Sequence, residues 1–408
     1  MNRTGAAVPR DAAGLGPPPR GAAPVRFPRV RVSGSARQRG VRYGEQCRDR
    51  IGRSLAAYER VFAEYAGMSW SAARRVAKPF QDPIGAFSGA ILEELEGIAA
   101  GAGSDFEDIL TLNVRSELMF AAKAREAGRS APRGGCSALA VLPSRSVDGH
   151  TLLGQNWDWL LHARDTVVIL EVERAEGPDY VTVVEAGLLA KTGMNSSGIG
   201  VVTNTLISAN DRAHPGLPYH VLLRALLDSE TISDALATLQ SGPRSSSANY
   251  LLAHADGLSV DVEAQPGDQA TIALVWPDRG LALHTNHCVA APMQANDLSV
   301  WAIPDSPFRL ERLRQALGSS GDRLSLASCA TALADHGNFP ASVCYHPDPR
   351  LPAPRREETV ASVLMDLDAR RMLIADGTPC TTPYQDVDYS AFLGKPSVLR
   401  SGKGPTAA

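Results

Sequence analysis

The spacing of apolar residues changes along the chain, from a helical period early on to short strand-like runs later. Residues 40–122 favour helices, because four apolar side chains recur at i, i+4, i+7 and i+8 and so share one face: Ile91, Leu95, Ile98 and Ala99. Ser104 followed by Glu107 predicts a capping box at the start of a further helix. Residues 122–135 turn small and polar, which predicts an exposed loop or a boundary.

Beyond residue 136, short β-branched runs bounded by turn residues predict strands. They lie at 137–142, 151–155, 166–172, 180–185, 198–204, 249–254, 258–263, 270–276, 281–285, 359–367 and 371–375, with helical intervals near 217–240, 306–317 and 323–335. Asp256-Gly257 between two runs predicts a hairpin, and the last two runs form another. Strands with segregated helices and no regular βαβ alternation predict an α+β layered fold with mainly antiparallel sheets.

Composition narrows the possible partners and the compartment. The chain has 41 Lys and Arg against 44 Asp and Glu, a net charge of −3, which gives no electrostatic reason to expect nucleic acid or an anionic membrane as partner. No apolar run reaches the roughly 18 residues that cross a bilayer. Six scattered cysteines without a C-x-x-C pair favour reduced thiols and a cytoplasmic location.

The two ends of the chain differ from the rest. Residues 1–27 are rich in Pro, Ala, Gly and Arg, and such a segment buries too little apolar area to offset its ordering entropy. We therefore expect a disordered leader over 1–33, a helical part over 34–135, a catalytic part over 136–395 and a flexible tail over 396–408.

Cys136 stands after two glycines, at the junction between the helical part and the strand-rich part. Glycine makes strained backbone conformations accessible, so the thiol could attack the preceding carbonyl and form a thioester that water releases. The new chain would begin at Cys136, and its free α-amine, which titrates near pH 8, could act as general base for its own thiol. The alternative is that Cys136 is a small buried residue at a strand start.

The residues after Cys136 carry a family resemblance. Gly154-Gln155-Asn156-Trp157-Asp158 resembles the G-Q-N-W-D signature of the isopenicillin N acyltransferase family (acyl-coenzyme A:6-aminopenicillanic acid acyltransferases), in which a G-C cleavage site comes first. Further similar segments follow in order: Gly193–Gly198 with Gly200, Ala248–Leu251 with Glu263, His284–His287 and Asp305–Arg309. Gly97–Gly101 and Asn113–Glu117 upstream are also similar, so the resemblance runs from about residue 34 to 390.

This resemblance implies a four-layer αββα sandwich of the N-terminal-nucleophile type, processed into fragments 1–135 and 136–408 that stay associated. The substrate would be a small acyl amide or acyl-coenzyme A, with no cofactor needed for the chemistry. Transfer of the acyl group to an amine and its hydrolysis both remain open.

The resemblance also implies roles for individual side chains. Asp158 would hydrogen-bond near the freed amine as an ionised carboxylate, and its alternative is a turn or capping aspartate. Arg309 would lie beside the thiol and favour thiolate, whereas otherwise it is a solvated helix residue. Asn249 would donate to the tetrahedral oxyanion. Asn204 is a second donor by similarity to the wider cholylglycine hydrolase and penicillin acylase relatives, or else only a turn former. Trp157 and Trp159, two residues apart, are expected to pack in the core.

Two other classes of function compete with catalysis. His284, His287 and Cys288 could bind a metal ion, with His336, Cys344 or His346 completing the site. A relative that keeps the fold only as a binding module would be expected to lose Cys136, Asp158 or Asn249, and this chain keeps all three.

Overall fold

The computed structural model describes residues 27–126, 135–319 and 323–394. Most of the predicted leader (1–26) and the predicted tail (396–408) lie outside these residues. The strands are β1 Arg29–Gly34, β2 Ser137–Val141, β3 Leu152–Leu160, β4 Val167–Arg174, β5 Tyr180–Glu185, β6 Thr192–Asn195, β7 Ile199–Thr205, β8 Ala248–His254, β9 Leu258–Ala264, β10 Ile272–Val275, β11 Leu281–His284, β12 Glu357–Asp366, β13 Arg371–Ala375 and β14 Gln385–Asp388.

Helices occupy most of the first third of the described chain and return between strands later. They are α1 Ala36–Ala66, α2 Trp70–Ala77, α3 Gln81–Phe87, α4 Gly89–Ala102, α5 Phe106–Asn113, α6 Arg115–Glu126, α7 Tyr219–Leu226, α8 Ile232–Gln240, α9 Ala291–Gln294, α10 Ser299–Ala302, α11 Ser306–Ser319, α12 Leu326–Leu333 and α13 Ser390–Leu393. Short 3-10 turns lie at Lys78–Phe80, Leu161–Asp165, Gln269–Thr271 and Ala353–Arg355.

Two sheets form the middle of the molecule. Within the described residues, one has eight strands in the order β1-β4-β5-β6-β7-β8-β9-β10, and the other has six in the order β11-β2-β3-β12-β13-β14. Every pairing is antiparallel except that of β1 with β4. Strands β2 and β3 of the smaller sheet contact β7 and β8 of the larger one, so the sheets pack face to face.

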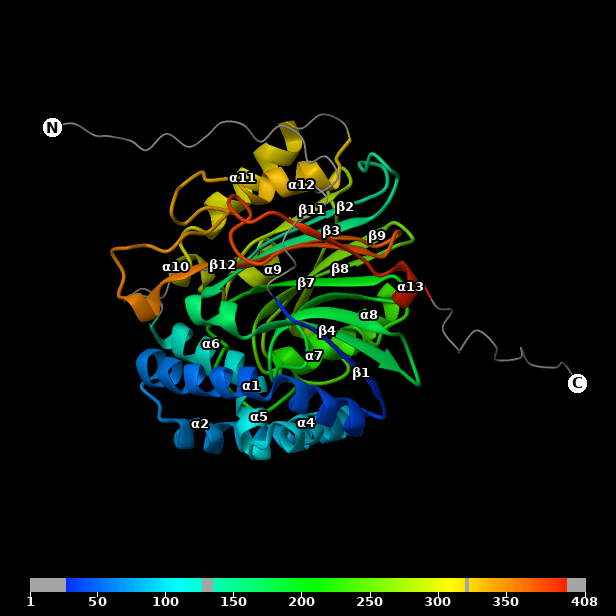
Figure 1. Ribbon diagram of the computed structural model, residues 1–408. Coiled ribbons are helices and arrows are strands. Elements are labelled where there is room, and N and C mark those ends of the chain that lie inside the picture. The colour runs from blue at the N-terminus through cyan, green and yellow to red at the C-terminus, as the bar shows by residue number, and fades with distance from the viewer. Residues whose placement is uncertain (1–26, 127–134, 320–322, 395–408) are drawn as a thin grey trace, which may run out of the picture.

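Helices cover both outer faces of this pair of sheets. Figure 1 shows α1, α4, α5 and α7 on the side of the larger sheet, and α11 and α12 against the smaller one. Strand β3 is buried along its whole length because it is covered on both faces, unlike a strand with one solvated side. The α+β class with mainly antiparallel strands is confirmed, and its layers are helix, sheet, sheet, helix.

Some of the predictions of individual turns, caps and elements are confirmed, and others are wrong. The Asp256-Gly257 hairpin joins β8 and β9, and its glycine has a φ of +88°. The capping box predicted at Ser104 is wrong, since α5 begins after Asp105 and has no side-chain cap. Residues 29–33, which the sequence assigned to the leader, belong to β1, and the interval 217–240 divides into α7 and α8.

The first long helix is fixed at both ends and along one face. Ser35 and Gln38 form a capping box at the start of α1, and Gly67 ends it in a left-handed conformation with φ of +60°. Glycines make the crossing of α1 with α4 close: a Cβ on Gly40 would lie 2.2 Å from the Glu94 carbonyl oxygen. The helical layer therefore packs backbone to backbone at this point.

Candidate active site

Cys136 lies immediately before β2, and its main chain is held on both sides. Its backbone N–H donates to Asn286 Oδ1 at 2.8 Å, and its carbonyl oxygen accepts from Arg309 Nη1 at 2.8 Å. Asn286 follows β11, the strand next to β2. Only 3% of Cys136 is exposed. The peptide bond before Cys136 is thus fixed in an enclosed, polar position.

The residue before Cys136 has no room for a side chain. A Cβ on Gly135 would lie 2.0 Å from Asn286 Oδ1 and 2.3 Å from Arg309 Nη2, both well inside van der Waals contact. Glycine is therefore required at position 135 by close packing against the groups that hold the Cys136 backbone.

The electrostatic surroundings of the thiol are mixed. Burial raises the pKa of Cys136, and the strongest effect in the opposite direction comes from the ammonium of Lys191. The Asp158 backbone N–H also lowers this pKa by hydrogen bonding, whereas the Asp158 carboxyl raises it. Lys191 is itself buried, with its Nζ 4.7 Å from the centre of the Trp157 ring. The charge of Lys191 thus opposes the effect of burial, but the pKa of Cys136 stays raised overall, and burial also lowers the pKa of Lys191.

The Asp158 carboxyl is turned toward a neighbouring strand. Thr359 Oγ1 donates to Asp158 Oδ1 at 2.6 Å, while Oδ2 has no partner among the described residues. Burial raises the pKa of Asp158 well above its usual value, against the opposing effect of Arg309. Burial thus works against the ionised form expected from the sequence, and the Cys136 N–H is accepted by Asn286.

Arg309 hydrogen-bonds several of the groups around Cys136. Its Nε donates to Asp305 Oδ2 at 2.7 Å, an i, i+4 pair in which Asp305 immediately precedes α11, and its Nη2 donates to Asn286 Oδ1 at 2.9 Å. With its bonds to the Cys136 carbonyl and to Ser137 Oγ, the guanidinium fork contacts four different partners. Arg309 lowers the pKa of the Cys136 thiol less than Lys191 does.

Asn204 and Asn249 form a pair on adjacent strands. They stand directly opposite each other on β7 and β8, so their side chains share one face of the larger sheet. Asn249 Nδ2 donates to Asp261, and its Oδ1 has no partner among the described residues. Both side-chain atoms of Asn204 are buried and also unpaired within the described chain. Because buried amides are normally hydrogen-bonded, these free groups mark a place where a ligand can bind.

Asp261, the partner of Asn249, belongs to a charged network with Glu263 and His284. His284 Nε2 is 2.9 Å from Glu263 Oε1 and 3.9 Å from Asp261 Oδ2. Burial opposes the charged imidazole, but the two carboxylates outweigh it and raise the pKa of His284 to about 9. The cationic imidazole thereby fixes Asp261, and through it the amide of Asn249.

The metal-binding alternative built on His284, His287 and Cys288 is not supported by their positions. His284 pairs with Glu263, His287 Nδ1 lies 2.8 Å from Ser306 Oγ, and Cys288 packs with Leu206 and Met293. Among the described residues, the His, Cys, Asp and Glu side chains that gather closely enough to bind an ion are a different set, which shares only some of the predicted members.

The sequence model of the family described as acyl-coenzyme A:6-aminopenicillanic acid acyl-transferase matches residues 145–379, more than half of the chain. This chain belongs to that family. The acyl-coenzyme A:6-aminopenicillanic-acid-acyltransferase 40 kDa form of Emericella nidulans is 31% identical over 258 residues, which span 62% of this chain and 66% of the relative, just under two thirds of its length.

Two solved structures resemble the chain more distantly. A variant of conjugated bile acid hydrolase from Clostridium perfringens has 12% identity and a TM-score of 0.44, covering 63% of this chain and 93% of its own. Penicillin V acylase from Agrobacterium tumefaciens has 14% identity and a TM-score of 0.38, covering 62% of this chain and 86% of its own.

The family match contains Asp158, Asn204, Asn249 and Arg309, and it begins after Cys136. Sequence reasoning missed two further residues at this site, Asn286 and Lys191. Asn286 lies inside the His284–His287 motif, so the sequence marked its position, but only the histidines of that motif were considered as functional residues. Lys191 directly follows the apolar stretch 186–190, and only the structure shows that it is buried, because lysine is usually exposed.

A cavity of about 380 Å³ opens near the Asn249 network, between β10, β11 and the end of α11. Asp261 contributes to its wall, together with apolar Val275, Leu281 and Leu283. Cys136 is not among the residues that line this cavity. None of the described helices combines the length and the apolar character that crossing a membrane requires.

Proposed function

We propose that this chain is a self-processing enzyme of the N-terminal-nucleophile type, which breaks or transfers an amide- or thioester-linked acyl group through a thioester on Cys136. The observation that carries the proposal is the clamp around Cys136. Asn286 accepts its N–H, Arg309 donates to its carbonyl, and no side chain fits at position 135. Family membership supports the same class of chemistry.

Self-processing would proceed in two steps, formation of a thioester and its hydrolysis. The Cys136 sulfur attacks the Gly135 carbonyl carbon, the C–N bond breaks, and the departing amine of Cys136 takes up the thiol proton. Water then hydrolyses the thioester, leaving a carboxylate on Gly135 and a free thiol beside a free α-amine. Asn286 Oδ1, which accepts the amide N–H in the precursor, is positioned to hold that amine afterwards.

Acyl transfer would use the same two groups. The α-amine takes the thiol proton while sulfur attacks the substrate acyl carbon, and the leaving amine or coenzyme A thiol departs with a proton. The resulting acyl thioester is resolved by water in an amidohydrolase or by an amine in an acyltransferase. Asn249 and Asn204 are proposed as donors to the oxyanion, because one N–H of Asn249 and the whole Asn204 amide lack partners in the described chain.

Denaturing mass spectrometry tests the processing step. We expect wild-type protein to give two chains separated before Cys136, and Cys136→Ala to stay as one 43.3 kDa chain. Cys47→Ala is the matched control, because Cys47 is also buried but lies on α1. An active wild-type enzyme that remains a single chain would refute self-processing and leave thiol catalysis standing.

A second experiment separates transfer from hydrolysis. Processed enzyme is incubated with a series of acyl-coenzyme A thioesters, with and without an added primary amine. A new amide only in the presence of amine identifies a transferase. Free acid in both reactions, with no new amide, identifies a hydrolase.

A further inference from the structure

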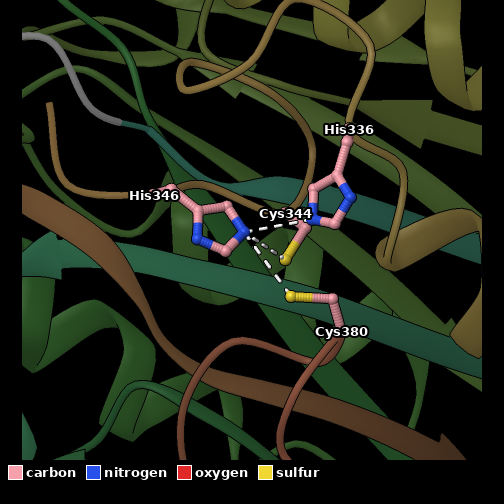
Figure 2. Close-up of side chains that lie close together, drawn as sticks. All are labelled: His336, Cys344, His346 and Cys380. Atoms are coloured by element: carbon pink, nitrogen blue, oxygen red, sulfur yellow. Dashed lines mark hydrogen bonds between the residues drawn. The ribbon is translucent and has the colours of Figure 1, made fainter. Parts of the chain in front are cut away.

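Four side chains outside the candidate active site converge on one point. They are His336, Cys344, His346 and Cys380, and their ligand atoms all lie within 4.8 Å of one another. Figure 2 shows the two imidazoles and the two sulfur atoms directed toward a common centre. His346 Nε2 lies 3.0 Å from His336 Nε2 and 3.5 Å from each of the sulfur atoms of Cys344 and Cys380.

These separations match the edges of a zinc coordination tetrahedron. Zinc bonds of about 2.0–2.1 Å to nitrogen and about 2.3 Å to sulfur give edges of about 3.4 Å between nitrogens, 3.6 Å between nitrogen and sulfur, and 3.8 Å between sulfurs. Two thiolates with two imidazoles are also the ligand set that a structural zinc site uses. Neither cysteine is in a disulfide in this structure.

The ligands come from segments that only the fold brings together. His336 follows α12, Cys344 and His346 lie in the loop before β12, and Cys380 lies between β13 and β14. The loops are held by their own hydrogen bonds: the Cys344 N–H donates to the Asp335 carbonyl at 3.0 Å, and the His346 N–H donates to the Pro340 carbonyl at 3.0 Å. A site whose ligands are placed by such bonds needs little rearrangement to bind an ion.

We propose that His336, Cys344, His346 and Cys380 bind one Zn²⁺ in a closed, tetrahedral site that ties together the two loops at this end of the smaller sheet. All four positions are filled by protein, so the role is structural and no position is left for water or substrate. The assignment does not rest on the function proposed for Cys136.

Short hydrogen-bonded paths connect the site to the candidate active site. Tyr345, between two of the ligands, donates its N–H to Thr359 Oγ1 at 2.9 Å, and Thr359 Oγ1 donates to Asp158 Oδ1 at 2.6 Å. Asn156, two residues before Asp158, donates to the Leu333 and Val343 carbonyls at 2.8 Å each. A bound ion would therefore stiffen the loop that orients Asp158.

Metal analysis of the full-length protein tests the proposal. We expect about one zinc per chain after expression with Zn²⁺ and dialysis, and chelation should lower the unfolding temperature. Protein reconstituted with Co²⁺ alone should show the intense visible bands of tetrahedral cobalt and a thiolate charge-transfer band. Substoichiometric zinc together with an octahedral cobalt spectrum would overturn the assignment.

Substitutions of single cysteines test whether the zinc ion binds at this cluster. Cys344→Ser and Cys380→Ser should each lose most of the zinc, whereas Cys329→Ala should keep it, because Cys329 is buried on neighbouring α12 but is not in the cluster. If both serine variants fail to fold, the cobalt spectrum of wild type decides. A wild-type protein that lacks zinc and whose mass shows a Cys344–Cys380 disulfide would also overturn the proposal.

Discussion

At the scale of single residues, the candidate site depends on polar groups that the folded chain leaves partly unsatisfied. Buried amides of Asn204 and Asn249 face each other across two strands without a full set of partners in the described chain. Leaving such groups unpaired costs about 1–3 kcal/mol each, so a protein keeps them where a ligand supplies the missing bonds. The same reasoning separates Asn204 from an ordinary turn asparagine.

Replacing these amides tests their assignment. Asn249→Ala and Asn204→Ala should each lower kcat by roughly 10²–10³-fold with little change in KM, the usual effect of removing an oxyanion donor. Steady-state kinetics on processed protein measures both constants. A raised KM with unchanged kcat would assign these residues to substrate binding instead, and thermal unfolding of each variant controls for loss of fold.

The titration of His284 provides an independent check on the network behind Asn249. Its folded pKa of about 9 exceeds the ordinary value of 6.5, so the cationic form stabilises the fold fully below about pH 6.5. That contribution, about 1.4 kcal/mol for each pKa unit, is lost as the pH rises through 9. NMR titration of ¹⁵N-labelled histidines should find one imidazole still protonated at pH 8.

Glu263→Gln should move that titration to lower pH, because it removes the carboxylate 2.9 Å from Nε2. His287 provides an internal comparison, since burial and the neighbouring charge of His284 lower its pKa to about 4. Two histidines titrating together near pH 6.5 would contradict this description of the network.

At the scale of elements, glycines allow the helices α1 and α4 to pack closely, and only the tertiary structure explains why these positions are glycine. Gly40 and Gly44 of α1 face Gly97 and Gly101 of α4, and a Cβ on any of them would lie 2.0–2.4 Å from a backbone oxygen of the other helix. The sequence showed a helical stripe on α4 but not which glycines it meets, because helix pairing is not encoded in periodicity.

Two glycines of α1 make a matched pair of variants. Gly40→Ala should destabilise the protein by about 1–3 kcal/mol through overpacking against α4. Gly52→Ala, whose Cβ meets nothing within 4 Å, should be neutral or stabilising by up to about 1 kcal/mol, since alanine suits a helix better. Urea denaturation of both variants measures the difference, and equal effects would contradict the close crossing.

Strands were easier to predict than the contacts among them. The runs after residue 136 identified most strands of both sheets, because β-branched alternation is a local property. The β1 segment was missed, since Arg29–Gly34 is short, begins beside the polar leader and pairs with the distant β4.

The residues of the candidate sites were predictable to different degrees. The two glycines before Cys136 pointed to it as the candidate nucleophile, whereas Asn286 and Lys191 could be identified only from the three-dimensional packing. The residues of the proposed zinc site were partly named but grouped with other residues, because Cys380 lies 34 residues from His346 in sequence.

At the scale of the whole molecule, the proposed cleavage point does not coincide with a structural boundary. β1 and the helices α1 to α6 precede Cys136, yet β1 is an edge strand of the larger sheet. Arg115 on α6 and Glu185 on β5 form a buried ion pair of 2.7 Å across the same division. Breaking such a pair is strongly unfavourable, so both fragments should stay bound.

Processed protein should therefore elute from a sizing column as a single species of about the precursor mass, and it should separate into two chains only in denaturant. Its unfolding midpoint should rise with protein concentration, because two chains must meet to refold. Cys136→Ala, as an uncleaved chain, should show a midpoint independent of concentration. Fragments that separate under native conditions would contradict the shared sheet.

The parallel pairing of β1 with β4 also has a consequence for the lifetime of the molecule. The precursor brings this strand to the sheet edge while one continuous polypeptide still tethers it, so closure is an intramolecular search. After cleavage before Cys136 that tether is gone, and an unfolded mature molecule would have to recover its partner by diffusion. We therefore expect the cleaved form to persist by slow unfolding, with renaturation after heating far less efficient than first-time folding.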